Sequence, residues 1–155
     1  MRDPLLTQLE EVYRSEFRRF LRVATAIIGD EERALDAVQE GFARAVRHRG
    51  RFRGEGSFAG WLWHTVVNAA RKERARRPDP VLAAVPDEVP ESPAPVRAAV
   101  AALPERQRLV LFLRYYADLD YRAIAEALEI SPGTVGATLN AAHATLRRQL
   151  QEVSR

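Results

Sequence analysis

The residues of this chain that could do chemistry are few in kind and spread along its 155 residues. Cysteine is absent, and the three histidines, His48, His64 and His143, fall in separate predicted elements. A zinc site needs several His, Cys or carboxylate ligands close together, so a lone histidine is a poor metal candidate. A glycine-rich phosphate loop with its lysine is missing, and no close pair of carboxylates lies in a cleft-like context. The sequence therefore predicts a protein that is not an enzyme and needs no cofactor.

Arginines and one aromatic residue alternate in a glycine-rich loop from His48 to Gly56. Cations can hold phosphates and a flat ring can stack on a base, which is how many proteins hold single-stranded nucleic acid. Arg51, Phe52 and Arg53 are the candidates for such contacts. A basic surface loop whose phenylalanine packs on the core would have the same composition, and the residues alone do not decide between the two.

The helix predicted after this loop, which Ser57 would cap, continues the polar pattern. Its apolar stripe is predicted to be buried and consists of Phe58, Trp61, Leu62, Val66 and Ala69. A second face carries His64, Asn68, Arg71 and Lys72, and the positive end extends through Arg74, Arg76 and Arg77. An asparagine beside cations can bond a base edge, but most exposed polar residues only face solvent.

The stretch from Pro104 to Leu150 has the spacing of a helix-turn-helix. Apolar periodicity predicts a helix from Glu105 to Ala117, and Asp120 is a good N-cap for a short helix from Tyr121 to Leu128. Ser131 followed by Pro132 then begins a last helix. In a helix-turn-helix this last helix offers its first turns to the major groove of DNA. An ordinary helical hairpin is the alternative.

Two amphipathic helices are predicted ahead of the basic loop, from Leu5 to Ile28 and from Glu31 to about Arg47. The residues of the second helix predicted to face inward are Ala34, Leu35, Val38, Phe42, Ala45 and Val46. Its other face carries Asp36, Gln39 and Glu40, for which contact with solvent is the usual explanation.

Charge and proline content divide the chain into two parts and a connector. Residues 1–77 carry 16 Lys and Arg against 11 Asp and Glu, a net charge of +5. Residues 78–95 contain six prolines and no cation, which predicts a semi-extended acidic linker. The predicted fold is all-α, with small helical domains at 1–77 and 96–155.

No apolar run reaches the roughly 20 residues that cross a bilayer, and no signal peptide is recognisable, so we expect a cytoplasmic monomer that does not bind membranes.

Both halves together resemble an extracytoplasmic-function (ECF, group IV) sigma factor of bacterial RNA polymerase, and the resemblance covers nearly the whole chain. ALDAVQEGFARA is similar to the family's region-two pattern Ala-x-Asp-Leu-x-Gln-Glu-x-Phe. The next helix matches its Trp-Leu…Asn…Arg pattern at Trp61, Leu62, Asn68 and the trailing arginines. Region four is matched by LPERQRLVLFLRYYADLDYRAIAEAL, ISPGTV and LRRQL.

The resemblance implies a promoter-specificity subunit made of a three-helix region-two domain and a region-four helix-turn-helix domain. Its partners would be core RNA polymerase, promoter DNA and, plausibly, an anti-sigma protein. The residues implied to bind the polymerase clamp helices are Asp36, Gln39, Glu40 and Phe42. Those implied to bind the minus-ten element are Arg51, Phe52, Arg53, Ser57, Trp61, His64, Asn68, Arg71, Lys72 and Arg74. The linker would thread the RNA-exit path of the polymerase.

The last helix departs from the family in its charge. After Gly-Thr-Val the family usually continues Lys-Ser-Arg-Leu-x-Arg-Ala-Arg, whereas here no Lys or Arg occurs between Ser131 and Leu146. The residues left to bind the minus-thirty-five element are Ser131, Thr134, Thr138, Asn140, His143 and Arg147. Phosphate neutralisation supplies most non-specific affinity for DNA, so we expect a weak grip here. The alternatives are a polymerase-binding adaptor or a helix-turn-helix regulator whose C-terminal domain mainly contacts protein.

Overall fold

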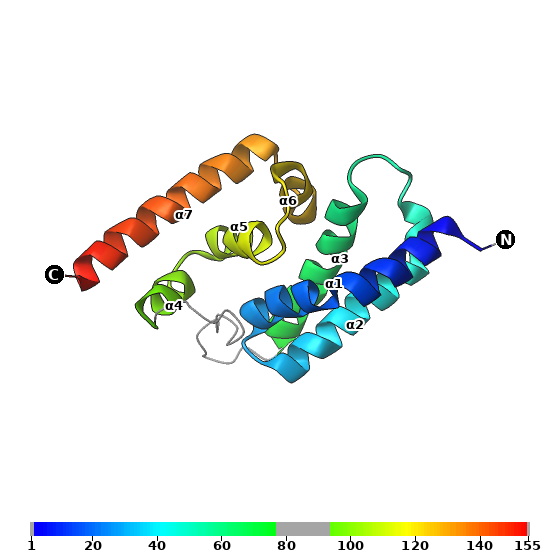
Figure 1. The fold of residues 1–155 in the computed structure, drawn as a ribbon, viewed down its shortest axis with the longest axis horizontal. Helices are drawn as coiled ribbons and strands as arrows, with labels where there is room; N and C mark the ends of the chain where they lie inside the picture. Colours follow the sequence, from blue (N-terminus) through cyan, green and yellow to red (C-terminus); the bar gives the residue numbers. More distant parts are fainter. Residues whose placement is uncertain (1, 77–93, 155) are drawn as a thin grey trace.

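The computed structural model describes residues 2–76 and 94–154, and every regular element in these two ranges is helical (Figure 1). This confirms the predicted all-α fold. Most of the predicted linker, residues 78–95, lies outside the described residues. The helices are α1 (Pro4–Ile28), α2 (Glu31–Arg47), the 3-10 turn η1 (Arg49–Arg51), α3 (Phe58–Arg76), α4 (Ala94–Ala101), α5 (Glu105–Tyr115), α6 (Tyr121–Leu128) and α7 (Pro132–Val153).

The front half is a bundle of α1, α2 and α3 around an aromatic centre. The ring of Phe20 stacks on Trp63 with centroids 3.9 Å apart, and Phe42 meets Phe20 edge-on at 5.0 Å. At Gly41 an added Cβ would lie 2.9 Å from the Cα of Val66, so α2 and α3 cross with no room for a side chain there. This close crossing fixes α3 against α2.

Two predictions about buried faces in this half are corrected by the structure. Leu35 was expected to face inward, but it is 37% exposed, because α1 and α3 cover only one side of α2. In α3 the fully buried tryptophan is Trp63, whereas Trp61 is only half-buried. The single predicted stripe of α3 is too narrow, because the helix is covered on one side by α1 and α2 and on another by α6.

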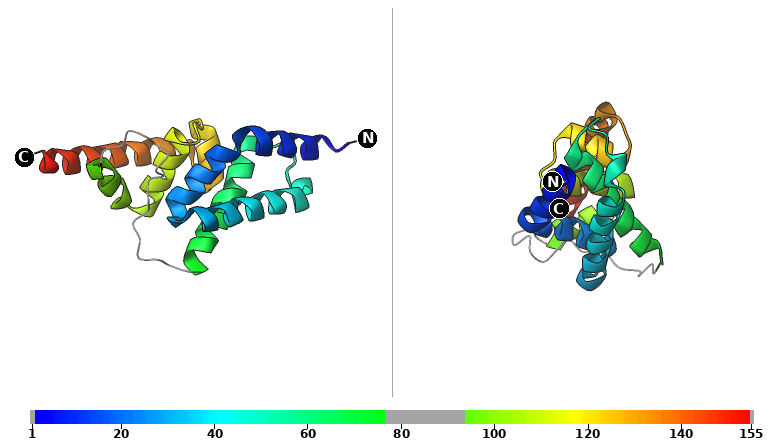
Figure 2. Two further views of the ribbon diagram at one scale, coloured as in Figure 1. Left: turned by 60° about the horizontal axis from the view of Figure 1, so that its bottom comes forward. Right: turned by 90° about the vertical axis from the view of Figure 1, so that its right-hand side faces the viewer.

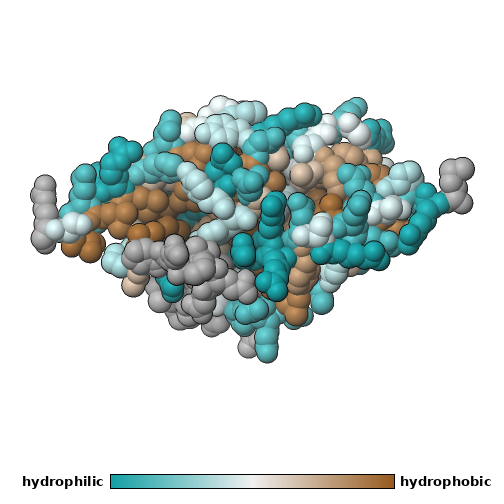
Figure 3. All heavy atoms as spheres, viewed as in Figure 1, coloured by the Kyte–Doolittle hydropathy of each residue, from teal (hydrophilic) through white to brown (hydrophobic). Residues whose placement is uncertain are grey.

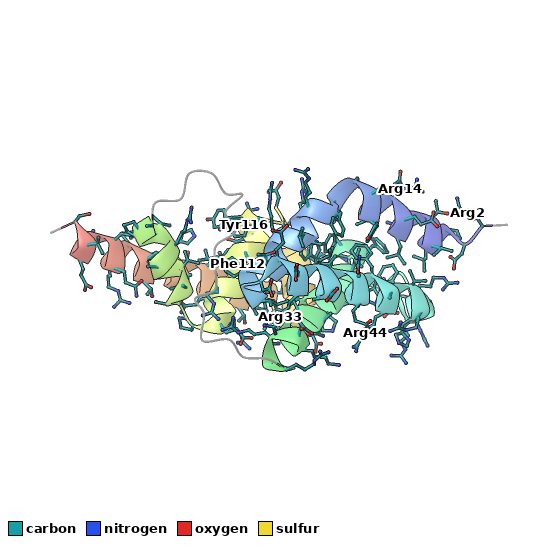
Figure 4. All side chains as sticks on the ribbon, turned by 90° about the horizontal axis from the view of Figure 1, so that it is seen from below. Arg2, Arg14, Arg33, Arg44, Phe112 and Tyr116 are labelled. Atoms are coloured by element: carbon teal, nitrogen blue, oxygen red, sulfur yellow. The ribbon has the colours of Figure 1, made fainter. Side chains whose placement is uncertain are left out.

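A partly buried ion pair joins the start of α2 to the end of α3. The Arg33 side chain, whose residue is 9% exposed, donates from Nε to Oε1 of Glu73 over 3.1 Å and from a terminal nitrogen to the Glu73 carbonyl over 2.6 Å. Arg33 and Arg44 both project from α2 in Figure 4. A buried charge is costly unless it is paired and hydrogen-bonded, so this pair fixes the relative position of the two helices.

The back half contains α4 to α7, and its helix starts follow the predicted capping residues. Asp120 accepts a hydrogen bond from the backbone of Ala123 over 2.8 Å, and Ser131 accepts one from Thr134 over 3.1 Å. Helix α5 ends at Tyr115, two residues before the predicted Ala117. Helix α4 was not predicted; it is short and begins at Ala94, inside the expected linker.

The two halves pack against each other. Helix α3 lies along α6, and α1 meets α5 (Figures 1 and 2). The described termini lie at opposite ends of the long axis (Figure 1). One hydrophobic core runs through both halves, from Leu9 in α1 to Ala142 in α7.

On the face shown in Figure 3, apolar surface gathers between α7 and α4, and hydrophilic side chains cover much of the rest. Among the described helices, none is long and apolar enough to cross a membrane.

Candidate nucleic-acid interface

The polar face of α3 lines a basic hollow at the end of α2. This hollow has a volume of about 540 Å³, and its lining residues are Arg44, Arg47, His48, Arg51, Trp61, His64, Thr65 and Asn68. His64 and Asn68 lie one turn apart, with Nε2 of His64 3.1 Å from Nδ2 of Asn68. Cations around an indole ring and an amide are groups that can hold a nucleotide by phosphate, stacking and base-edge contacts. Four of the predicted minus-ten residues therefore share one hollow.

The loop before α3 is anchored by its aromatic residue. Phe52 is half-buried, and its ring lies 5.6 Å from that of Phe58 and 5.4 Å from that of Trp61. Arg51 and Arg53 on either side are exposed. Of the two explanations left open by the sequence, the structure shows the phenylalanine packed on the helix, with the two cations flanking it at the surface.

The start of α3 touches the back half through residues that the sequence did not single out. The backbone N–H of Ser57 donates to Oε2 of Glu126 over 2.7 Å, while the Ser57 hydroxyl accepts from Gly60 over 3.1 Å as a helix cap. The ring of His64 lies with Nδ1 3.1 Å from the Ala127 carbonyl oxygen and Nε2 3.0 Å from a carboxylate oxygen of Glu129. Nothing local in the sequence marks these partners, because they depend on how the two halves meet.

The basic end of α3 lines a second hollow, of about 520 Å³, against α5. Asn68, Arg71, Lys72 and Arg74 contribute to it from α3, and Arg108 contributes from α5. Arg74 donates to the Ile27 carbonyl at the end of α1 over 2.6 Å. Burial, with a smaller effect of the Arg74 charge, lowers the pKa of the Arg108 guanidinium. Like charges are therefore held close together where the halves meet.

Arg71 has a carboxylate partner in this hollow, since it pairs with Glu105 of α5 at 2.8 Å. Lys72 is exposed. The minus-ten residues predicted on α3 thus extend along one side of the helix, from Ser57 at its start to Arg74 near its end, and the back half contacts this side at both ends.

The face of α2 predicted to bind polymerase is exposed at Asp36, Gln39 and Glu40. Hydrogen bonds from Arg44 at 3.0 Å and from Arg47 at 3.2 Å lower the pKa of the Glu40 carboxyl, and the bond from Arg44 has the larger effect. Phe42 differs from these three, because it is only 6% exposed. It therefore belongs to the core and packs α2 against the rest of the front half.

The predicted minus-thirty-five residues all lie on α7 or at its cap. The hydroxyls of Ser131 and Thr134 are 2.8 Å apart at the start of the helix, and Asn140 and Arg147 are exposed. Thr138 is half-buried. His143 is exposed but engaged, with Nε2 3.0 Å from the hydroxyl of Tyr115 and the two rings stacked at 5.9 Å.

Within the described ranges no group of three or more His, Cys, Asp or Glu side chains could hold a metal ion. The side chains that line the first hollow include cations, imidazoles, an amide and an indole ring.

Two family models match the chain, one for each half. The model described as Sigma-70 region 2 matches residues 12–78, and the model described as Sigma-70, region 4 matches residues 94–146. The boundary between the matches falls in the acidic, proline-rich stretch.

Three curated relatives match along most of their lengths. The RNA polymerase sigma-E factor of Streptomyces coelicolor is 30% identical, and the match covers 92% of this chain and 86% of the relative. The RNA polymerase sigma-H factor of Pseudomonas aeruginosa is 28% identical, with 88% and 83% covered. The ECF RNA polymerase sigma factor SigW of Bacillus subtilis is 27% identical, with 82% and 80% covered.

Solved structures share the fold at lower identity. The chain superimposes on CnrH, solved in complex with the cytosolic domain of CnrY, with a TM-score of 0.74 at 21% identity, covering 95% of this chain and 90% of the other. It superimposes on the sigma factor RpoE of Bartonella quintana, solved with the anti-sigma factor NepR, with a TM-score of 0.72 at 17% identity, covering 94% and 98%. Both region matches and these relatives lead to one conclusion: the chain belongs to the extracytoplasmic-function family of RNA polymerase sigma factors.

Proposed function

We propose that this promoter-specificity subunit binds core RNA polymerase through the exposed face of α2 and captures the minus-ten strand with α3 and the preceding loop. Helix α7 then lies at the minus-thirty-five element. The working units are residues 1–77 and 96–155, joined by the acidic linker, and the protein acts in the cytoplasm as a monomer bound to polymerase. The polymerase supplies the chemistry, and this chain supplies recognition.

The observation that carries this proposal is the hollow beside α3. Trp61 offers a flat ring, Asn68 and His64 offer hydrogen-bonding groups, and Arg51 offers a phosphate contact within the same cavity. Stacking of a base on an aromatic ring contributes about 1–3 kcal/mol. A few such contacts offset the unstacking of a few base pairs, so promoter opening draws its energy from base capture.

The polymerase contact rests on the exposed polar face of α2. Asp36 and Gln39 are exposed, and Glu40 is held by Arg44 and Arg47, so this face offers both acceptors and cations to a partner. Phe42 contributes indirectly, because its ring packs on Phe20 in the core and holds the exposed face of α2 in place. A rigid face loses little conformational entropy when it docks.

A second candidate function concerns the back half alone. Helix α7 carries no Lys or Arg before Arg147, and its exposed residues include Ala137, Ala141 and Ala144. A smooth, uncharged helix surface suits packing against another helix better than it suits phosphates. On this alternative the back half mainly binds protein, and an anti-sigma protein is one such partner, as for the relatives solved with CnrY and NepR.

Run-off transcription with purified bacterial core polymerase tests the proposal, on a promoter that the chain directs and on versions with the minus-ten or minus-thirty-five element scrambled. We expect initiation to require the chain. Scrambling the minus-ten element should abolish initiation, whereas scrambling the minus-thirty-five element should leave most of it. Trp61→Ala with Asn68→Ala should abolish initiation, whereas Gln8→Ala, an exposed change on α1, should not. Core binding without initiation on any template would refute the promoter role and favour an adaptor.

A further inference from the structure

The second hollow, between the end of α3 and the first turns of α5, carries an excess of positive charge. Five of its lining residues are cations and one is a carboxylate: Arg44, Arg71, Lys72, Arg74 and Arg108 against Glu105. A concave surface lined mainly by one sign of charge focuses the electric field and concentrates ions of the opposite sign. The hollow therefore attracts anions.

Two of these cations are held in place by neutral groups. Arg74 donates to the Ile27 carbonyl over 2.6 Å. Arg108 donates to the Leu103 carbonyl over 2.8 Å and to the Ala101 carbonyl over 3.2 Å. Within residues 2–76 and 94–154, neither guanidinium forms an ion pair. A carbonyl orients a guanidinium without balancing its charge, and a guanidinium has five N–H donors, so both side chains are fixed in position with donors left for an anion.

Both guanidinium groups are partly withdrawn from water and lie close enough to interact. Arg74 and Arg108 are half-buried. Burial lowers the pKa of Arg108, and the charge of Arg74 adds to this effect while that of Glu105 opposes it. Arginine stays charged at neutral pH even so, and the two like charges repel. A phosphate bound to both would remove this repulsion and accept charge-assisted hydrogen bonds.

The other ionisable groups at this end of α3 leave room for an anion. Glu105 pairs with Arg71 at 2.8 Å, so its negative charge is already balanced. Lys72 is exposed and pairs with no carboxylate of the described residues. It is also the only lysine in the sequence. Three cations of the hollow, Lys72, Arg74 and Arg108, are therefore available to a ligand.

The hollow also has an apolar side, which Ile27, Leu109 and Phe112 line from α1 and α5. The amide of Asn68 lines it as well, and an amide can bond the edge of a base. Its volume of about 520 Å³ falls within the range of small-molecule sites, roughly 300–1,000 Å³, and exceeds what a single phosphate needs. A ligand with a flat ring at one end and phosphates at the other matches both sides of the hollow.

We propose that this hollow binds a nucleoside diphosphate or triphosphate, with its phosphates against Lys72, Arg74 and Arg108 and its base against the apolar side. Both halves contribute, because Lys72 and Arg74 belong to α3 and Arg108 belongs to α5. Lys72 and Arg74 are also assigned above to the minus-ten strand, so Arg108 is the residue that identifies the nucleotide site. The inference goes beyond the proposed function and does not depend on it.

Isothermal titration calorimetry of the full chain with ADP tests the proposal, in EDTA so that no metal ion competes for the phosphates. Adenosine and pyrophosphate each carry one part of the ligand, and both should bind more weakly than ADP. Arg108→Gln should weaken ADP binding roughly tenfold or more, the loss expected from one charged hydrogen bond. Arg106→Gln is the matched control, because it removes an exposed arginine of the same helix that does not line the hollow, and it should leave ADP binding unchanged.

A covalent label on Lys72 gives a second measurement that needs no variant. The ribose dialdehyde made from ADP by periodate condenses with a lysine amine to an imine and releases water, and added cyanoborohydride reduces the imine to a stable amine. We expect labelling of Lys72, to be located by peptide mass spectrometry and distinguished there from labelling of the α-amino group. Excess ADP should prevent it, whereas excess adenosine should not.

The outcomes separate the nucleotide site from its rivals. Equal ADP affinity of the Arg108→Gln variant and the unmodified chain overturns the site, as does labelling of Lys72 that ADP does not prevent. Pyrophosphate that binds as tightly as ADP overturns the assignment to a nucleotide. If Arg108→Gln weakens binding of a fluorescein-labelled single-stranded DNA as much as it weakens ADP binding, the hollow belongs to the DNA path and holds no separate small-molecule site. Core-dependent initiation is measured separately, so none of these failures bears on the promoter role.

Discussion

The exposed alanines of α7 offer a direct way to measure how this helix meets DNA. Ala137 and Ala141 lie one turn apart on the exposed side, within the part of the helix that has no cation. Replacing both by lysine adds two positive charges without disturbing a buried contact, and lysine is nearly as good a helix former as alanine. We predict that the double variant binds a minus-thirty-five duplex more tightly and with a steeper dependence on salt.

The magnitude follows from counterion release. Each new phosphate contact steepens the plot of log affinity against log salt by about 0.9, so two contacts steepen it by about 1.8. Raising the salt from about 50 to about 200 mM should then weaken the variant roughly twelvefold more than it weakens the unmodified chain.

Fluorescence anisotropy with a labelled duplex across this salt range measures both slopes. A variant with Gln151→Lys and Ser154→Lys is the matched control, because it has the same net charge but places the new lysines at the exposed far end of α7. An equally steeper salt dependence in both variants would mean that the added lysines act only through the overall electrostatic field of the protein. An unchanged slope in the Ala137 and Ala141 variant would refute the docking of α7 in the groove and favour the protein-binding alternative.

Three further predictions concern the fold that holds these surfaces. Asp120→Ala removes the N-cap of the short α6 and should lower the free energy of unfolding by about 1 kcal/mol in urea denaturation, while Asp120→Asn should retain most of it. Phe20→Ala should cost about 3–5 kcal/mol, because it empties the space between Trp63 and Phe42; a loss no larger than that of Phe20→Leu would contradict this packing. Burial raises the pKa of the Tyr116 phenol above its ordinary value of 10.0, so the folded chain keeps a proton that the unfolded chain releases. Stability should therefore fall as the pH rises above that ordinary value, and Tyr116→Phe should reduce this fall in melting temperature; an identical slope would argue against burial as its cause.

Much of this fold is predictable because the signals are local. Ser57, Asp120 and Ser131 each accept a backbone hydrogen bond at the helix start that the sequence assigns to them. Capping depends on residues two or three positions apart, which a single sequence contains. Helix α4 has no such signal: it is eight residues long and rich in alanine, and the prolines around it favour an extended chain.

The buried face of α3 and the partners of its polar side are not predictable in this way. Trp61 and Trp63 are two residues apart, so a helix buried on one stripe could hide only one of them deeply. The helix is instead covered from two directions, which no periodicity in α3 reveals. Glu126 and Glu129 likewise look like solvent-exposed residues of a short helix, and they enter the site only because α6 is laid along α3.

The continuous core described above has a consequence for how the chain unfolds. Since buried apolar residues run without a break from α1 to α7, the two halves stabilise each other across the α3–α6 contact. If one half unfolds, apolar surface on the other half becomes exposed to water, and this free-energy cost couples the unfolding of the two halves. The chain should therefore melt as one cooperative unit while its two halves are packed together, although its sequence divides into two family regions. The cooperativity of melting then measures how tightly the two regions are held together.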